Sequence, residues 1–122
     1  MHIIMGSENA KLFAEKYTVL ELDTIKFMPA QQVIPAYCVI ENIAITDIPK
    51  IESMGNLHTN LLENYRKKDW NYCEQAIEHL LGFWGGEIDS FYTDLLQRIA
   101  KYKEQDPGES WDGTIEKHTT SE

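Results

Sequence analysis

Two runs in the first third of the chain are rich in β-branched and aromatic residues, and they cover residues 17–27 and 32–41. The four residues between them, Met-Pro-Ala-Gln at 28–31, supply a turn, so the pair predicts an antiparallel hairpin. Pro35 lies inside the second run and has no main-chain N–H to donate to a neighbouring strand. We therefore expect Pro35 to face an open sheet edge or to lie at a bulge.

Beyond residue 50 the apolar period becomes helical. Between Ile51 and Tyr65, apolar residues and His58 recur every three or four positions, which predicts one amphipathic helix. Asp69 is a suitable N-cap for a second helix. The apolar stripe of that helix is Trp70, Cys73, Ile77, Leu80 and Leu81.

Three glycines end the second helix and hold two aromatic residues between them; in order, the segment is Gly82, Phe83, Trp84, Gly85 and Gly86. A third amphipathic helix is predicted over residues 87–103. Its apolar positions are Ile88, Phe91, Leu95, Ile99 and Tyr102. The Asp-Pro-Gly sequence at 106–108 ends the regular structure.

The remaining segments give weaker patterns. Ser7 is a good N-cap for a short helix over residues 8–15, with Leu12 and Phe13 as its apolar contacts. Residues 42–49 read as irregular, and the polar residues from His118 to the end are expected to be frayed or disordered.

The predicted fold class is therefore α+β: a short helix and a β-hairpin, followed by three amphipathic helices. We divide the chain into a hairpin segment (1–49), a helical unit (50–117) and a disordered end (118–122). Two strands alone are marginally stable in water, so they must pack on the helices or pair edge to edge with another chain.

Composition narrows the choice of partners. The 122 residues carry a net charge of −9, which argues against a nucleic-acid partner because phosphate binding needs clustered Lys and Arg. No apolar run approaches the roughly 20 residues needed to span a bilayer, so no membrane partner is expected. The start of the chain has no cationic segment typical of a secretion signal, and Cys38 and Cys73 read as small core residues. These features predict a cytoplasmic protein.

Candidate chemistry is sparse. The sequence has no phosphate loop, dinucleotide fingerprint or nucleophile elbow, and its histidines have no metal-ligand spacing, so no cofactor is expected. His58 lies on a helical stripe and is interpreted as a hydrogen-bonded core histidine. Glu21 and Asp23 should point to one face of a strand, where such a pair could hold a cation, although a solvated face is the simpler interpretation.

Three residues are candidates for contact with a partner: Pro35 at a strand irregularity, Trp84 in the glycine-rich turn, and Trp111 after the Pro-Gly break. Aromatic anchors are enriched at interfaces, but packing inside the molecule is the competing interpretation for both tryptophans. Trp84 would then cover the hairpin, and Trp111 would fold back as a clasp on the helices.

The order of several short segments resembles the last part of bacterial class III adenylate cyclases. In the hairpin half, Ile-Met-Gly-Ser-Glu-Asn-Ala at 4–10, Glu-Leu-Asp-Thr-Ile-Lys at 21–26 and Tyr-Cys-Val at 37–39 carry the likeness. In the helical half, Tyr-Arg-Lys-Lys-Asp-Trp at 65–70, Leu-Gln-Arg-Ile-Ala-Lys-Tyr at 96–102 and Trp-Asp-Gly at 111–113 resemble the tetratricopeptide-like tail of such cyclases. The resemblance spans nearly the whole chain.

The resemblance also implies that the cyclase chemistry is missing. In that family the metal-binding aspartates and the transition-state asparagine and arginine precede the segments matched here. The turn lysines expected to approach the triphosphate fall at Met28 and Ala30, with Pro29 in place of a glycine. Without these charges nothing evident neutralises a triphosphate, so we expect no cyclase activity.

These observations lead to three hypotheses. The first is a non-catalytic interaction or assembly module that forms homo-oligomers through strand edges or a helical face. The second is a regulator that docks on a class III cyclase. The third is a small-molecule or metal-binding protein that uses the face of Glu21 and Asp23 or the turn at Trp84.

Overall fold

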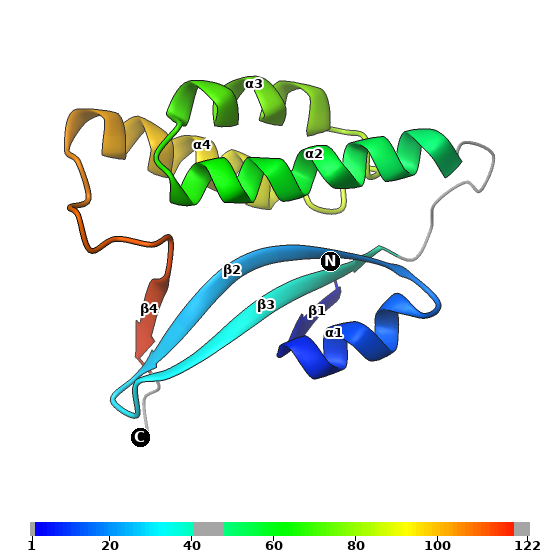
Figure 1. Ribbon diagram of the computed structural model, residues 1–122, viewed down its shortest axis with the longest axis horizontal. Helices are drawn as coiled ribbons and strands as arrows, with labels where there is room; N and C mark the ends of the chain where they lie inside the picture. Colours follow the sequence, from blue (N-terminus) through cyan, green and yellow to red (C-terminus); the bar gives the residue numbers. More distant parts are fainter. Residues whose placement is uncertain (1, 41–47, 119–122) are drawn as a thin grey trace.

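The computed structural model describes residues 2–40 and 48–118, and these residues form a small four-stranded sheet with four helices (Figure 1). The α+β class predicted from the sequence is confirmed. In chain order the elements are β1 (His2–Met5), α1 (Ser7–Ala14), β2 (Thr18–Met28), β3 (Gln32–Ile40), α2 (Ile48–Arg66), α3 (Trp70–Leu80), α4 (Asp89–Glu104) and β4 (Ile115–His118).

The strands lie in the order β1-β3-β2-β4. The predicted hairpin of β2 and β3 is confirmed as the antiparallel centre of the sheet, with Thr18 opposite Ile40. Two strands were not predicted: β1 pairs antiparallel with β3, and β4 pairs parallel with β2. The prediction that the chain is frayed from His118 onward is therefore wrong for His118 itself, the last residue of β4. Residues 119–122 and 42–47 lie outside the described residues, and the prediction that positions 48 and 49 are irregular is wrong, because α2 begins at Ile48.

Pro35 marks a bulge in the hairpin, as predicted. Glu21 pairs with Tyr37, but the next pair joins Thr24 to Pro35. Two residues of β2, 22 and 23, therefore stand opposite the single residue Ala36. Because side chains alternate along a strand, the extra residue shifts the alternation of β2. The burial pattern shows this shift, since the buried positions of β2 are 20, 22 and then 25.

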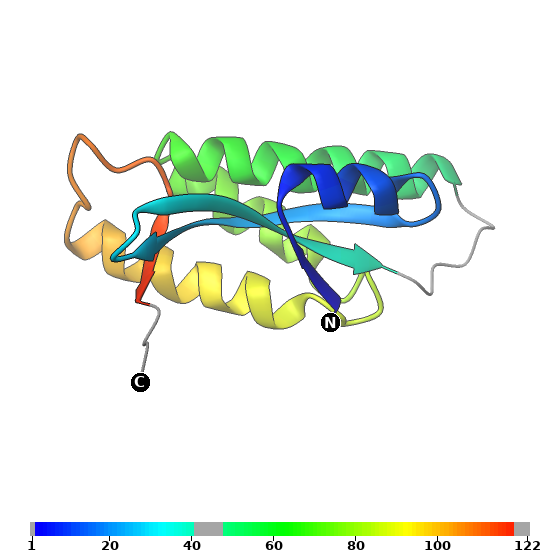
Figure 2. The same cartoon turned by 90° about the horizontal axis from the view of Figure 1, so that it is seen from below.

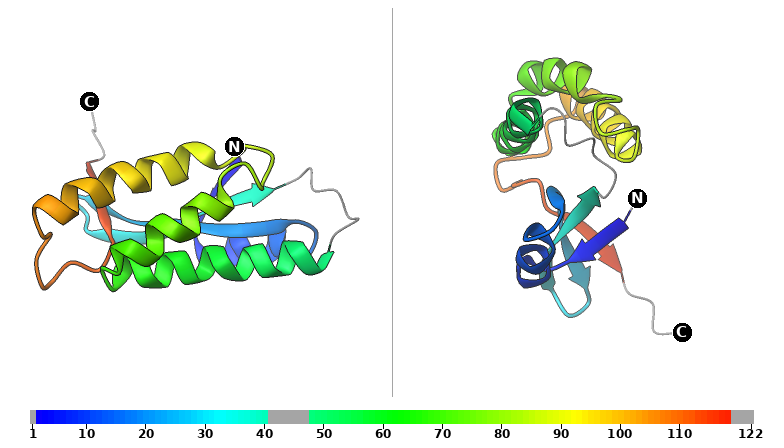
Figure 3. Two further views of the ribbon diagram at one scale, coloured as in Figure 1. Left: turned by 90° about the horizontal axis from the view of Figure 1, so that it is seen from above. Right: turned by 90° about the vertical axis from the view of Figure 1, so that its right-hand side faces the viewer.

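The three long helices lie on one face of the sheet and α1 lies on the other (Figure 1). Seen from below, α1 lies in front of the strands and the long helices lie behind them (Figure 2). The end-on view in Figure 3 places α3 on α2 and α4, away from the sheet. One apolar core joins the helix-facing strand residues Leu20 and Cys38 to residues such as Leu61, Ile77 and Leu95, so both predicted segments contribute to it.

The long helices follow the predicted stripes. On α2, His58, Leu61 and Tyr65 are buried. Asp69 caps α3, because its carboxylate accepts from the Tyr72 main-chain N–H at 3.2 Å. Gly82 follows α3 with a positive φ of 78°, which glycine adopts without strain. Leu81 departs from the prediction, since it lies outside the buried stripe and is exposed.

Two details of α1 were predicted wrongly. Gly6, with φ of 91°, is the N-cap, and Ser7 is the first residue of the helix. Leu12 is 66% and Phe13 is 41% exposed, whereas Ala10 is the buried residue of α1. Because α1 is buried through the small residue Ala10, its larger apolar side chains lie near solvent. Within the described residues, no helix combines the length and apolar character needed to cross a membrane.

Candidate functional site

One edge of β2 is only partly covered. Strand β4 pairs with β2 from Ile25 to Met28, and within the described residues no strand pairs with this edge from position 18 to position 23. The Glu21 carbonyl points to this edge, because it accepts a hydrogen bond from His58 Nε2 of α2 at 2.6 Å. Main-chain groups two residues apart point to the same side of a strand, so the N–H and C=O of Val19 also point outward. Exposed strand edges of this kind are templates for pairing with another chain.

A groove runs between this edge and α2, with a cavity volume of about 510 Å³. Its strand wall is formed by residues 18–21 of β2. Its helix wall includes Ile51, Glu52, Gly55 and Thr59. The groove therefore combines a main-chain edge with apolar side chains and the carboxylates of Glu21 and Glu52, a combination suited to binding an extended polypeptide rather than a compact ion.

Gly55 gives the helix wall its shape. It lies inside α2 with Ile51 one turn before it and Thr59 one turn after it. A Cβ added at Gly55 would meet no atom of the described residues within 4 Å outside its immediate chain neighbours and the helix's own backbone, and its φ lies outside the left-handed region. Glycine inside a helix costs about 1 kcal/mol relative to alanine, and neither backbone geometry nor crowding requires it here. We refer to the space beside Gly55, between Ile51 and Thr59, as the notch.

The side chain of His58 links the edge of β2 to the helices α2 and α4. Its side chain is 1% exposed, with Nε2 bound to the Glu21 carbonyl and Nδ1 lying 2.8 Å from the Tyr92 hydroxyl of α4. Since a carbonyl only accepts, Nε2 carries the proton and Nδ1 accepts from the hydroxyl. Burial lowers the pKa of His58 from its usual value, although the Glu21 main chain and carboxylate oppose the shift. The predicted hydrogen-bonded core histidine is confirmed.

Glu21 and Asp23 do not form a joint site. The Glu21 carboxylate binds Arg66 at 3.1 Å, and Asp23 binds the Arg98 guanidinium through both oxygens at 2.8 and 3.0 Å. The two carboxylates therefore hold separate arginines of α2 and α4 instead of one cation, and the interpretation as a solvated face is wrong for Asp23, whose side chain is 14% exposed. Within the described residues, no group of three or more His, Cys, Asp or Glu side chains is placed to hold a metal ion.

The three residues predicted to contact a partner lie in different parts of the molecule. Pro35 lies at the bulge of the interior strand β3, and its carbonyl accepts from the Gly6 N–H at 2.8 Å. Trp84 is 4% exposed and packs edge-on against Phe83, with ring centroids 4.8 Å apart. A side chain so fully buried offers a partner almost no surface in this conformation.

Trp111 packs within the molecule as the predicted clasp. Its ring centroid lies 5.1 Å from that of Tyr65, 5.6 Å from Trp70 and 5.3 Å from Tyr102. Gly113, two residues later, has a φ of 89°, and a Cβ there would lie 3.1 Å from Arg66 Cγ. The glycine therefore lets the chain turn close to α2 before it enters β4.

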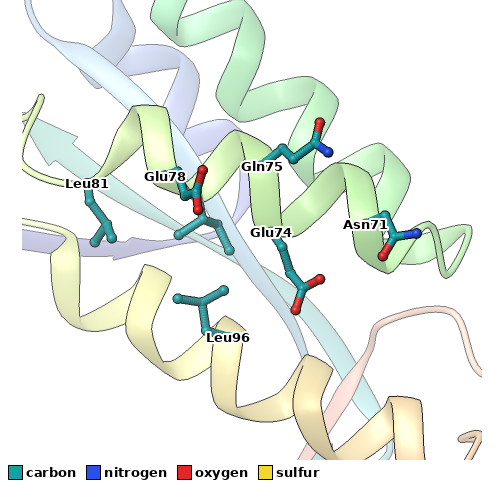
Figure 4. Close-up of a pocket in the computed structure, with 7 residues that line it drawn as sticks. Asn71, Glu74, Gln75, Glu78, Leu81 and Leu96 are labelled. Carbon is teal, nitrogen blue, oxygen red and sulfur yellow. The ribbon is translucent and has the colours of Figure 1, made fainter.

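A second groove lies between α3 and α4 (Figure 4). Its volume is about 480 Å³, and Leu81 and Leu96 lie beside the carboxylates of Glu74 and Glu78. Glu74 already binds Lys103 of α4 at 2.6 Å. This groove lies between two helices, so it lacks the main-chain strand edge that distinguishes the groove at β2.

The two cysteines offer no reactive thiol. Both are buried, as predicted, and burial raises the pKa of Cys38 to about 11 and that of Cys73 to about 12. A thiol is nucleophilic as its thiolate, so neither is prepared for attack at neutral pH.

The β2 edge and the notch were missed from the sequence. The isolated glycine inside a helical pattern was the available signal for the notch. Searches with protein-family models, among curated proteins and among solved structures find no match for this chain. The resemblance to class III cyclases stays a prediction.

Proposed function

We propose that this protein is a non-catalytic interaction module that binds an extended polypeptide segment by strand addition at the uncovered edge of β2. The observation that carries the proposal is that β4 covers β2 only from Ile25 to Met28. The outward main-chain groups at Val19 would supply hydrogen bonds to the added strand, and α2 would contact its side chains. Such strand addition is a recurring mode of peptide recognition.

The lack of catalytic function is supported by the state of the polar groups near the groove. Both ring nitrogens of His58 are engaged in hydrogen bonds, and burial favours the neutral ring. The Glu21 carboxylate is bound to Arg66. Neither His58 nor Glu21 is therefore poised to exchange a proton with a ligand in the groove, and Glu52, its other carboxylate, is exposed to water.

The proposed occupant is a segment of a partner protein, because the exposed carboxylate of Glu52 in the groove favours a cationic segment over a second copy of this chain, whose net charge is −9. The homo-oligomer predicted from the sequence is the alternative occupant. A class III cyclase as the partner is implied only by the resemblance. Light scattering of the purified chain separates self-association, which raises the mass above 14.1 kDa, from binding of an added peptide to a monomer.

The test uses a fluorescent seven-residue peptide of alternating threonine and valine and a matched pair of variants. Val19→Pro removes the outward N–H, whereas Val19→Thr keeps it with a side chain of similar shape. We expect saturable binding to the native chain and to Val19→Thr, and about tenfold weaker binding to Val19→Pro, the loss expected for one hydrogen bond. Circular dichroism verifies that both variants fold. Equal binding by both variants, or no binding by the native chain, would overturn the proposal.

A further inference from the structure

We propose that the groove selects an extended segment that carries an apolar side chain for the notch at Gly55 and a Lys or Arg for Glu52. This inference rests on the proposed function, since it specifies which segment the β2 edge accepts. It follows from three features of the helix wall that the fold itself does not require.

The first feature is the empty space of the notch. No side chain or main chain in residues 2–40 and 48–118 fills the space beside a Cβ at Gly55, and glycine is the residue that weakens a helix interior most after proline. Ile51 borders the notch on one side and makes it partly apolar. A strand added to β2 would place every second side chain toward α2, where the notch admits one that an ordinary helix surface would exclude.

The second feature is the charge beside the notch. Glu52 is exposed, lines the groove and makes no ion pair with any described residue. The Glu21 carboxylate of the strand wall is already paired with Arg66, so Glu52 is the uncompensated carboxylate of the groove, in a chain with a net charge of −9. A cationic side chain on the bound segment would be attracted to this wall, and an acidic one would be repelled.

The third feature is spacing. Glu52 and Gly55 are three residues apart on α2, a rise of about 4.5 Å, whereas successive side chains on one face of a strand lie about 6.6 Å apart. The flexible stem of a lysine or arginine spans the difference. The apolar and the basic residue of the bound segment are therefore two positions apart, in either order along the chain.

The experiment compares three fluorescent peptides by anisotropy. The reference is Thr-Lys-Thr-Leu-Thr-Lys-Thr, which offers the basic residue on both sides of the leucine. In the second peptide serine replaces leucine, and in the third glutamate replaces both lysines. We expect the reference to bind at least tenfold more tightly than either of the others, with the preference for lysine over glutamate lost in Glu52→Lys.

The notch is tested by Gly55→Phe, which fills it, against Ser53→Phe, which adds the same side chain on α2 at an exposed position that does not line the groove. Gly55→Phe should weaken the reference peptide to the level of the serine peptide, and Ser53→Phe should leave it unchanged. Equal binding of all three peptides, with binding still lost in Val19→Pro, would overturn this inference and leave the proposed function intact. No binding by any peptide would contradict the proposed function itself. If Gly55→Phe does not fold, the surface variant Glu52→Lys decides the outcome.

Discussion

The Nδ1 atom of His58 lies 2.8 Å from the Tyr92 hydroxyl, and this contact joins α2 to α4 next to the edge of β2. The ring is neutral when it accepts from Tyr92 and donates to Glu21. Because burial lowers the pKa of His58, the unfolded chain takes up a proton at a higher pH than the folded chain does. The contribution of His58 to stability is therefore complete above its ordinary pKa of 6.5 and declines as the pH falls below it.

We expect the free energy of unfolding of the native chain to fall below pH 6.5 by up to about 1.4 kcal/mol per pH unit from this residue. His58→Gln can still donate to the Glu21 carbonyl but cannot titrate. Urea unfolding between pH 5.5 and 7.5 should show a steeper loss for the native chain than for His58→Gln. Parallel pH profiles would contradict the assignment, and subtracting the two profiles removes the contribution of the other histidines.

The ion pair of Asp23 and Arg98 connects the bulge to α4. Its side chains are 14% and 20% exposed, so water screens the pair only in part. Burial alone would lower the pKa of Arg98, but Asp23 and Tyr65 outweigh it and raise that pKa. Asp23→Asn should reduce the free energy of unfolding by about 2 kcal/mol, because it leaves a largely buried guanidinium with less compensation.

The matched control is the exposed pair of Lys103 and Glu74, where Glu74→Gln should cost at most about 0.5 kcal/mol. A double-mutant cycle that adds Arg98→Met to Asp23→Leu should recover part of the loss, since the two apolar residues leave no buried unpaired charge, and Asp94, which also binds Arg98, is half-exposed to water. Strictly additive losses would mean that the two residues act independently.

The aromatic clasp makes a separate prediction. Trp111→Ala removes ring contacts to Tyr65, Trp70 and Tyr102 and should cost about 2–3 kcal/mol, less than for a fully buried tryptophan. It should also release β4, so amide hydrogen exchange should accelerate in residues 115–118 before the β2–β3 amides are affected. Trp111→Phe should retain part of the stability. Unchanged exchange in β4 would show that the strand pairs without the clasp.

Elements defined by contacts between residues close in the sequence were predicted, and those defined by contacts between distant residues were not. The hairpin and the three long helices were predicted because their apolar periods run over many residues, and Asp69 was identified because capping is local. Strand β4 was not predicted, because its four residues pair with a strand that lies far away in the sequence. Pro35 indicated the bulge, but its effect on the alternation of β2 depends on which strand receives the extra residue. The pairing register of β2 and β3 decides which strand receives it, and no local sequence pattern indicates that register.

The candidate site was missed for a related reason. An open edge is defined by where another strand stops, so the groove at β2 could not be recognised before β4 was known.

The N-cap of α1 was predicted one residue too late. Ser7 was misassigned as the cap because glycine at the preceding position, with its positive φ, serves the same role without a side chain. Local sequence preference identified the correct region there but not the correct residue.

Gly55 allows stability and binding to be separated in one residue. Gly55→Ala should raise the free energy of unfolding by about 0.5–1 kcal/mol, because alanine favours the helix and its Cβ meets no described neighbour within 4 Å. The corresponding rise in melting temperature is about 2–5 °C for a chain of this size. Gly113→Ala is the matched control and should lower the melting temperature, because φ there is 89° and the added Cβ would press on Arg66. If Gly55→Ala instead destabilised the chain, the glycine would be needed for folding, and its space could not be attributed to a ligand.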